Sequence, residues 1–113
     1  MEKIFGTQVA VVYGHYLNKI LRKGQRQEDM DAAICWLTGF GVDELHQKLE
    51  SGITFTEFFE AANLHPNAPL ITGVICGVRI EDIQDPLMQK IRYMDKIVDE
   101  VGKGRPLAKV LRS

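Results

Sequence analysis

The chain has 113 residues, of which 45% are apolar and 26% are charged, and its formal net charge is −1. This length predicts one domain over residues 1–113, with a core that needs no disulfide or metal to hold it. A net charge so close to zero excludes a strong overall field that would attract nucleic acid or an anionic membrane.

The two cysteines, Cys35 and Cys76, each lie among apolar residues. The N-terminal residues lack the apolar run of a signal peptide, and the apolar stretches are far shorter than the roughly 20 residues that cross a bilayer. We therefore expect a cytoplasmic protein that crosses no membrane. In it, both thiols would be reduced and would serve as small core side chains.

Three helices are predicted in the first half of the chain, over residues 8–23, 27–38 and 43–51. Apolar residues recur along each of them at spacings of three and four, which places them on one stripe of a helix. Thr7 can cap the first helix, and Gly24 suits the left-handed position that ends it.

Two capping signals predict where later helices begin. Thr54 and Glu57 match a capping box, in which each side chain accepts the other residue's backbone amide. Asp85 followed by Pro86 combines an N-cap with a proline at the first helical position. The apolar stripe after this start runs to Gly102, and a short final helix follows a break.

The apolar block of residues 70–83 is ambiguous between helix and strand. One set of its apolar residues is spaced as in a helix, while another set alternates as in a strand. The alternating set comprises Val74, Cys76, Val78 and Ile80. We favour a helix because Pro69 suits a first helical turn and because a lone strand would have no partner elsewhere in the chain.

These elements predict an all-α, compact single-domain bundle of five to seven short helices, which includes two candidate helix–turn–helix-like units. Helices this short are marginal alone and depend on mutual packing. The predicted core comprises Tyr13, Leu17, Ile34, Trp36, Leu37, Phe55, Phe58, Phe59, Ile71, Val74, Ile75, Ile91, Met94 and Ile97.

Five stretches of the chain resemble a family of small bacterial proteins, the domain of unknown function 2200. They are residues 11–13 (VVY), 22–24 (RKG), 34–40 (ICWLTGF), 70–79 (LITGVICGVR) and 85–93 (DPLMQKIRY). The chain departs from the family at Gly14 and Phe40, where we expect proline and tyrosine. The resemblance implies a single-domain intracellular bacterial protein and implies no catalytic role.

Arg79 is the strongest candidate for a ligand-binding residue, because a guanidinium binds a carboxylate or phosphate with two hydrogen bonds. Trp36, His65 and Cys76 are the other residues that could line such a site, for an anionic small molecule or a minor enzyme activity. The alternative for Arg79 is an ion pair with a neighbouring carboxylate such as Glu81.

His46 and Glu50 are four residues apart on the third predicted helix, so they could share a metal ion. Two ligands do not make a metal site, and a solvated surface pair explains them better. The sequence predicts no metal and no cofactor, and it contains no phosphate-binding glycine motif.

Binding of DNA is disfavoured by the charge of the helix that would enter the groove. In the first helix–turn–helix-like unit this helix would be residues 42–51, and it carries Asp43, Glu44 and Glu50 but only one lysine, Lys48. Its carboxylates would repel the phosphates. The C-terminal tail is basic, but four such charges on a terminal helix are typical of a solvated face.

The absence of a catalytic constellation favours a non-enzymatic binding or interaction module, as a homodimer or with a protein partner. Whether the chain is an enzyme stays open. An anionic-ligand site near Arg79 is the alternative function, and weak nucleic-acid binding is the third.

Overall fold

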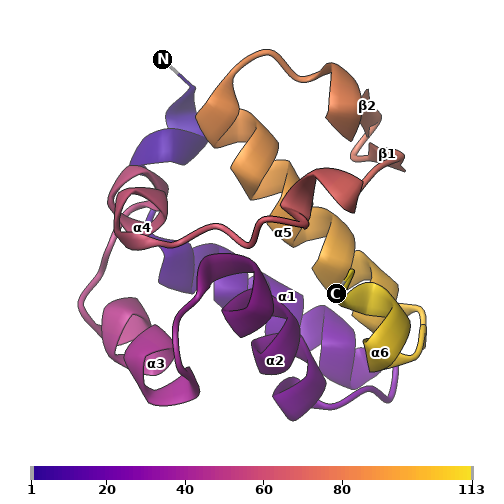
Figure 1. The fold of residues 1–113 in the computed structure, drawn as a ribbon. Helices are drawn as coiled ribbons and strands as arrows, with labels where there is room; N and C mark the ends of the chain where they lie inside the picture. Colours follow the sequence, from indigo (N-terminus) through magenta and orange to yellow (C-terminus); the bar gives the residue numbers. More distant parts are fainter. Residues whose placement is uncertain (1, 113) are drawn as a thin grey trace.

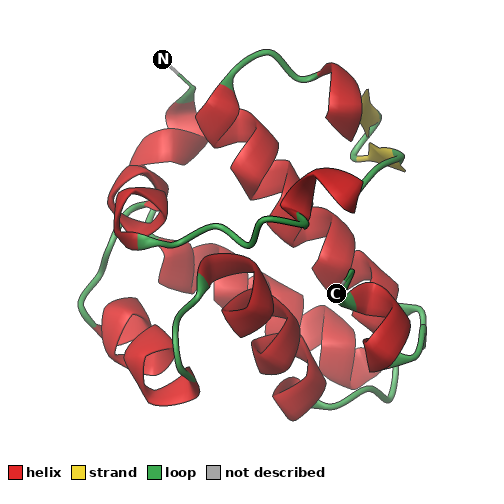
Figure 2. Cartoon of the chain, viewed as in Figure 1, coloured by secondary structure: helices red, strands yellow, loops and turns green. Residues whose placement is uncertain are grey.

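The computed structural model describes residues 2–112, and in this range the chain forms six α-helices and one small β-hairpin (Figures 1 and 2). The helices are α1 (Val9–Arg22), α2 (Gln27–Thr38), α3 (Val42–Glu50), α4 (Phe55–Ala61), α5 (Pro86–Gly102) and α6 (Leu107–Val110). Single 3₁₀ turns lie at Lys3–Gly6, Ala68–Leu70 and Ile80–Asp82. The prediction of a helical bundle with five to seven helices is confirmed.

Helix α5 is the longest element, and the other parts of the fold pack around it. It contacts α1, α2, α4 and α6, and it also contacts the strand β1 of the hairpin. Its buried face carries Ile91, Met94 and Ile97, which join Ile34 and Leu37 of α2 in one apolar core. The two faces of α5 therefore differ, one in the core and the other carrying charged residues.

The capping signals after residue 50 are confirmed in the structure. The Thr54 hydroxyl accepts the amide of Glu57 at 3.3 Å, and the Glu57 carboxylate accepts the amide of Thr54 at 3.0 Å. The Asp85 carboxylate accepts two amides of the first turn of α5, at 2.9 and 3.0 Å. Both caps are local, so the sequence was enough to predict them.

The predicted cap at Thr7 is wrong, because α1 begins one residue later and Gln8 precedes it without a side-chain cap. A backbone contact replaces the cap: the amide of Val9 donates to the Ile53 carbonyl at 2.9 Å. At the other end of α1, Gly24 has φ +77°, as predicted for a left-handed helix end.

The prediction of a helix after Pro69 is also wrong. The structure has a two-stranded antiparallel hairpin there, β1 (Val74–Ile75) and β2 (Val78–Arg79), joined by Cys76 and Gly77. Both turn residues have positive φ, 51° and 75°, as a type I′ turn requires. A two-residue turn lets the segment pair with itself, so the strand needs no partner elsewhere. The second candidate helix–turn–helix-like unit, which would have used residues 71–83, therefore does not form.

The hairpin also changes the predicted core at one position. Val74 is 50% exposed, whereas Ile71 and Ile80 on either side of the hairpin are fully buried and fix it to the body. Leu17, Trp36 and Ile75 are partly buried against the core, and the other predicted core residues are buried. Within residues 2–112, no helix combines the length and apolarity that a membrane crossing requires.

Candidate functional site

The structure brings together two of the four residues singled out from the sequence. The rings of Trp36 and His65 are stacked, with centroids 4.3 Å apart. Nδ1 of His65 accepts the amide of Asn67 at 2.9 Å, so this histidine stabilises the turn that follows α4. The indole Nε1 of Trp36 is buried and has no hydrogen-bond partner among the described residues.

Cys76 and Arg79 lie on the hairpin, and they do not form one site with Trp36 and His65. Cys76 is exposed at the turn and lines a pocket whose lining includes neither Trp36, His65 nor Arg79. The guanidinium of Arg79 is exposed, and its Nη1 lies 3.9 Å from the Glu81 carboxylate. The ion pair with Glu81 forms, and it joins neighbours in the chain rather than two helices.

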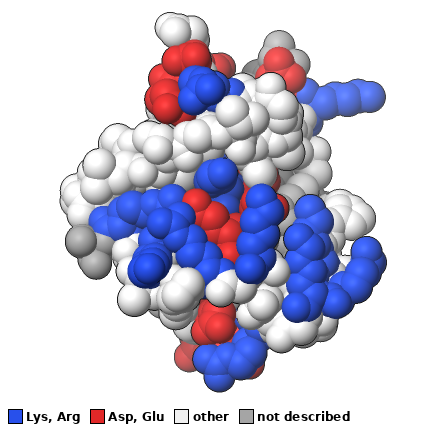
Figure 3. All heavy atoms as spheres, turned by 90° about the vertical axis from the view of Figure 1, so that its right-hand side faces the viewer, with Lys and Arg blue, Asp and Glu red and all other residues white. Residues whose placement is uncertain are grey.

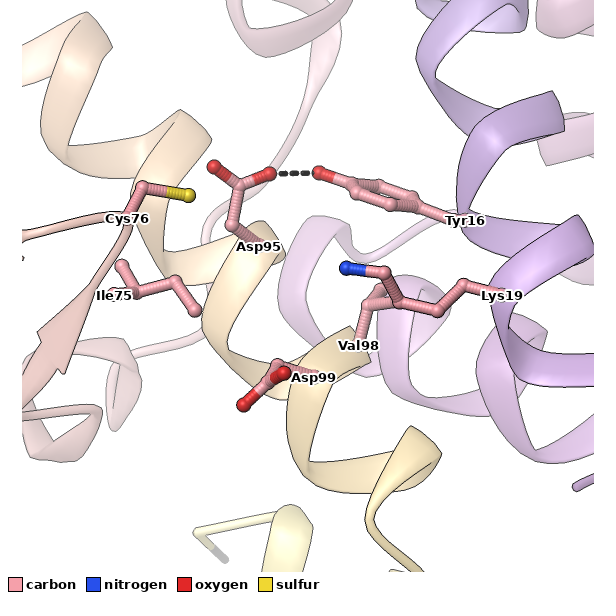
Figure 4. A pocket seen from close by; sticks show the side chains of 7 residues that line it. All are labelled: Tyr16, Lys19, Ile75, Cys76, Asp95, Val98 and Asp99. Carbon is pink, nitrogen blue, oxygen red and sulfur yellow. Dashed lines mark hydrogen bonds between the residues drawn. The ribbon is translucent and has the colours of Figure 1, made fainter. Parts of the chain in front are cut away.

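The pocket lined by Cys76 lies between the hairpin, α1 and α5 and has a volume of about 80 Å³ (Figure 4). The hydroxyl of Tyr16 donates to one carboxylate oxygen of Asp95, and Nη1 of Arg92 donates to the other at 2.7 Å. Burial and then the Asp95 charge raise the pKa of Tyr16 well above its ordinary value. Asp95 is thus already compensated by two donors.

Two charged residues complete the lining of this pocket. Figure 4 shows the ammonium group of Lys19 directed from α1 into the pocket, and Asp99 of α5 also lines it. Asp99 also pairs with Lys103 at 3.0 Å. The space suits a few water molecules or one small polar group, and its lining contains no paired nucleophile and base.

The prediction that both thiols are core side chains is wrong for Cys76. Its position in the turn exposes it, whereas Cys35 on α2 is half-buried and packs against the core. Burial, followed by the charges of Asp31 and Glu44, raises the pKa of the Cys35 thiol. Neither thiol forms a disulfide, and the two differ in accessibility.

His46 has a different partner from the one that the sequence suggested. Its Nε2 lies 2.9 Å from the carboxylate of Asp31, a buried residue of α2. The other oxygen of Asp31 accepts the Tyr13 hydroxyl at 2.6 Å, and that hydroxyl in turn accepts Nε2 of Gln27 at 3.0 Å. This network ties α1, α2 and α3 together.

Glu50 is exposed on α3. Within residues 2–112, no group of three or more histidine, cysteine or acidic residues is arranged to hold a metal ion.

A larger feature surrounds the pocket, and the sequence analysis missed it. Lysine and arginine side chains gather in a band across one face of the molecule, over α1, α5 and α6 (Figure 3). We call it the basic face and define it as the lysine and arginine residues of the end of α1, of α5 from residue 92 on, and of the segment after α5: Lys19, Arg22, Lys23, Arg92, Lys96, Lys103, Arg105, Lys109 and Arg112. They come from three separate stretches of the chain, so only the C-terminal part was visible as a cluster.

Packing between α1 and α5 brings these stretches together. A Cβ at Gly102 would lie 3.4 Å from Cδ of Lys23, so the end of α1 lies directly against the end of α5. The segment after α5 is held by Glu100, which is buried. Its two carboxylate oxygens accept both terminal nitrogens of Arg112, at 2.6 and 2.8 Å, and Arg105 lies 3.0 Å away.

The basic face separates the charge of the molecule into two regions. Three acidic residues, Asp95, Asp99 and Glu100, lie among its nine basic residues, which leaves an excess of six positive charges. The remainder of the chain has five basic and twelve acidic residues, an excess of seven negative charges. A net charge of −1 therefore conceals two opposite regions.

Fold and site together define a mostly helical protein with a small hairpin, a minor pocket and one strongly basic face. The chain belongs to the family of uncharacterized proteins conserved in bacteria (DUF2200), whose model matches residues 3–112. It is also similar to a solved structure described as uncharacterized protein SP1917, with 42% identity and a TM-score of 0.92. That similarity covers 98% of this chain and 93% of the other chain.

A search of the curated proteins finds no match. Neither the family nor the similar structure has a description that states an activity or a ligand.

Proposed function

We propose that this protein is a non-enzymatic interaction module that binds a polyanionic partner through the basic face. The observation that carries the proposal is the separation of charge: an excess of six positive charges on one face of a chain whose net charge is −1. Such a face attracts an anionic partner and orients it during encounter, while the acidic remainder of the surface repels it.

Part of this positive charge is already compensated inside the protein. Arg92, Lys103, Arg105 and Arg112 form ion pairs with the three acidic residues of the face. The remaining basic residues form no ion pair within residues 2–112, and they are Lys19, Arg22, Lys23, Lys96 and Lys109. These five cations support the proposal most directly, because their charge is not neutralised by a neighbour.

The test is binding of inorganic polyphosphate, measured by titration calorimetry on the full chain. A triple variant with Lys19→Gln, Arg22→Gln and Lys109→Gln removes three exposed charges from the basic face. Each phosphate that the variant no longer neutralises lowers the number of released counterions by about one, so we expect at least about tenfold weaker binding at low salt. Glutamine keeps the helix propensity of the replaced residues, so the fold should persist.

A matched control removes three positive charges elsewhere, through Lys3→Gln, Lys48→Gln and Lys90→Gln. Its net charge equals that of the first triple variant, but the basic face stays intact. We expect it to bind polyphosphate within about twofold of the natural chain, because screening limits charge effects to about 10 Å. Equal weakening in both variants, or no binding by the natural chain, would refute the proposal.

Location and assembly belong to the same proposal. The unpaired states of Cys35 and Cys76 support a reducing compartment, so we propose the cytoplasm. A homodimer is proposed as the second mode of interaction, since the hairpin exposes Val74 and Val78 and no third strand pairs with it within residues 2–112. Sedimentation of the natural chain tests the homodimer, and a mass of one chain at all concentrations would contradict it.

A further inference from the structure

We infer that the polyanionic partner is the phosphate backbone of double-helical nucleic acid, bound without reading its sequence. This inference rests on the proposed function and adds the class of partner. It differs from the expectation drawn from the sequence, which considered α3 as the reading helix. The acidic α3 takes no part here, because the positive charge lies on α1, α5 and α6.

The first argument is the size and rigidity of the basic face. Five of its nine basic residues stand on α1, α5 and α6, and the other four lie within two residues of a helix end. Since α5 packs against both α1 and α6, the backbone positions of these residues are fixed before binding. The molecule measures 34 × 32 × 24 Å along its principal axes. One turn of a duplex is about 34 Å long, so a face that crosses this molecule meets the phosphates of about one turn.

The second argument is the absence of an aromatic platform. All nine aromatic residues of the chain lie within residues 2–112, and every one is buried or half-buried. Proteins that bind single strands stack the bases on exposed aromatic rings. The groups of this face that can bind an anion are ammonium and guanidinium groups, and their contacts with phosphate carry no information about base identity. A duplex, with its regular and dense phosphates, suits it better than a single strand.

The third argument compares the duplex with an anionic membrane. Membrane-surface proteins insert apolar side chains between their basic residues. Two large exposed apolar residues adjoin this face: Leu21 precedes Arg22 in the chain, and the carbonyl of Val74 accepts Nζ of Lys96 at 3.3 Å. Two apolar side chains beside nine basic residues are few for insertion into a membrane, so the face favours contact with a phosphate backbone.

The experiment measures the anisotropy of two labelled duplexes of about one to two turns and unrelated sequence, with the full natural chain. We expect both to bind with affinities within about threefold of each other. With four to five phosphates contacted, the affinity should fall about 10²-fold or more between 50 and 200 mM salt. The triple variant of Lys19, Arg22 and Lys109 should bind at least about tenfold more weakly and with a shallower salt dependence.

Three competing probes decide between partners: a single strand of the same sequence, poly-glutamate, and vesicles that contain phosphatidylglycerol. Tighter binding of any of these than of the duplexes would overturn the inference, as would a strong preference between the two duplex sequences. If polyphosphate binds through the basic face and the duplexes do not, the inference fails while the proposed function stands. If polyphosphate does not bind, both fail.

Discussion

Tyr13 and Tyr16 lie three residues apart on α1, and each donates a hydrogen bond to an aspartate of another helix. Tyr13 donates to Asp31 of α2 in a buried network that includes His46. Tyr16 donates to Asp95 of α5 beside an open pocket on the basic face. A tyrosine–aspartate pair thus joins helices inside the body in one place and borders the solvent-exposed basic face in the other.

The difference lies in what else reaches each carboxylate. Asp31 is buried, and its oxygens are used by groups within the body of the protein. Asp95 is compensated by Tyr16 and by Arg92, and the pocket beside it is open to solvent. We therefore expect substitutions in the Tyr13–Asp31 pair to destabilise the protein more than substitutions in the Tyr16–Asp95 pair.

The largest effect is expected from Asp31→Ala. Removal of this carboxylate leaves the Tyr13 hydroxyl and the His46 ring without their partner, and we expect a loss of about 3 kcal/mol in the free energy of unfolding. Urea denaturation measures it. The control is Asp29→Ala, which removes a surface ion pair with Arg26 and should lose less than about 1 kcal/mol. Similar losses in both variants would show that the buried network contributes no more to stability than a surface ion pair does.

The second effect concerns alkaline pH. Burial, followed by the hydrogen bond to Asp31, raises the pKa of Tyr13 above 10.0, and burial raises the pKa values of Tyr16 and Tyr93 in the same direction. A tyrosine whose pKa is higher in the folded than in the unfolded protein contributes its full stability at pH values below its unfolded pKa. This contribution is lost as the pH rises from the unfolded pKa through the folded pKa. We expect unfolding to become easier above pH 10 by about 1.4 kcal/mol per pH unit for each tyrosine.

The measurement is phenolate absorbance followed together with circular dichroism. The chain has three tyrosines, and all three have raised pKa values, so absorbance should rise only as the helices unfold. Half-ionisation of one tyrosine near pH 10 in a fully helical protein would contradict this expectation.

The smallest effect is expected from Tyr16→Phe. Asp95 keeps its ion pair with Arg92 in this variant, so we expect a loss of about 1 kcal/mol. Tyr93→Phe is the matched control, because the Tyr93 hydroxyl makes no hydrogen bond within residues 2–112, and it should change stability by less than about 0.5 kcal/mol. A loss at Tyr16 as large as that of Asp31→Ala would remove the distinction between the two pairs.

The sequence predicted the parts of the fold that depend on neighbours along the chain. The bounds of α2 were predicted to the residue, and the caps at Thr54 and Asp85 were correct, because each uses contacts within three positions. The hairpin was missed for two reasons. Its apolar residues fit both periods, and Cys76-Gly77 is not the usual Asn-Gly signal of a type I′ turn.

The features of the candidate site depend on contacts between distant parts of the chain. Tyr16 and Asp95 are 79 positions apart, and the basic face combines residues of α1, α5 and α6. No local pattern joins these residues, and the net charge hides the face because the rest of the chain is acidic. Trp36 and His65 were named for a shared site, and they do stack, although Cys76 lies at a pocket that neither of them lines.

The ties of Glu100 to Arg105 and Arg112 also have a consequence for biosynthesis. This carboxylate lies buried in the body, while the two guanidinium groups that neutralise it follow it in the chain and are therefore synthesised after it. A nascent chain that has released α5 but not yet Arg105 and Arg112 holds this charge with no counterion. We therefore expect Glu100 to be buried only after Arg112 has left the ribosome.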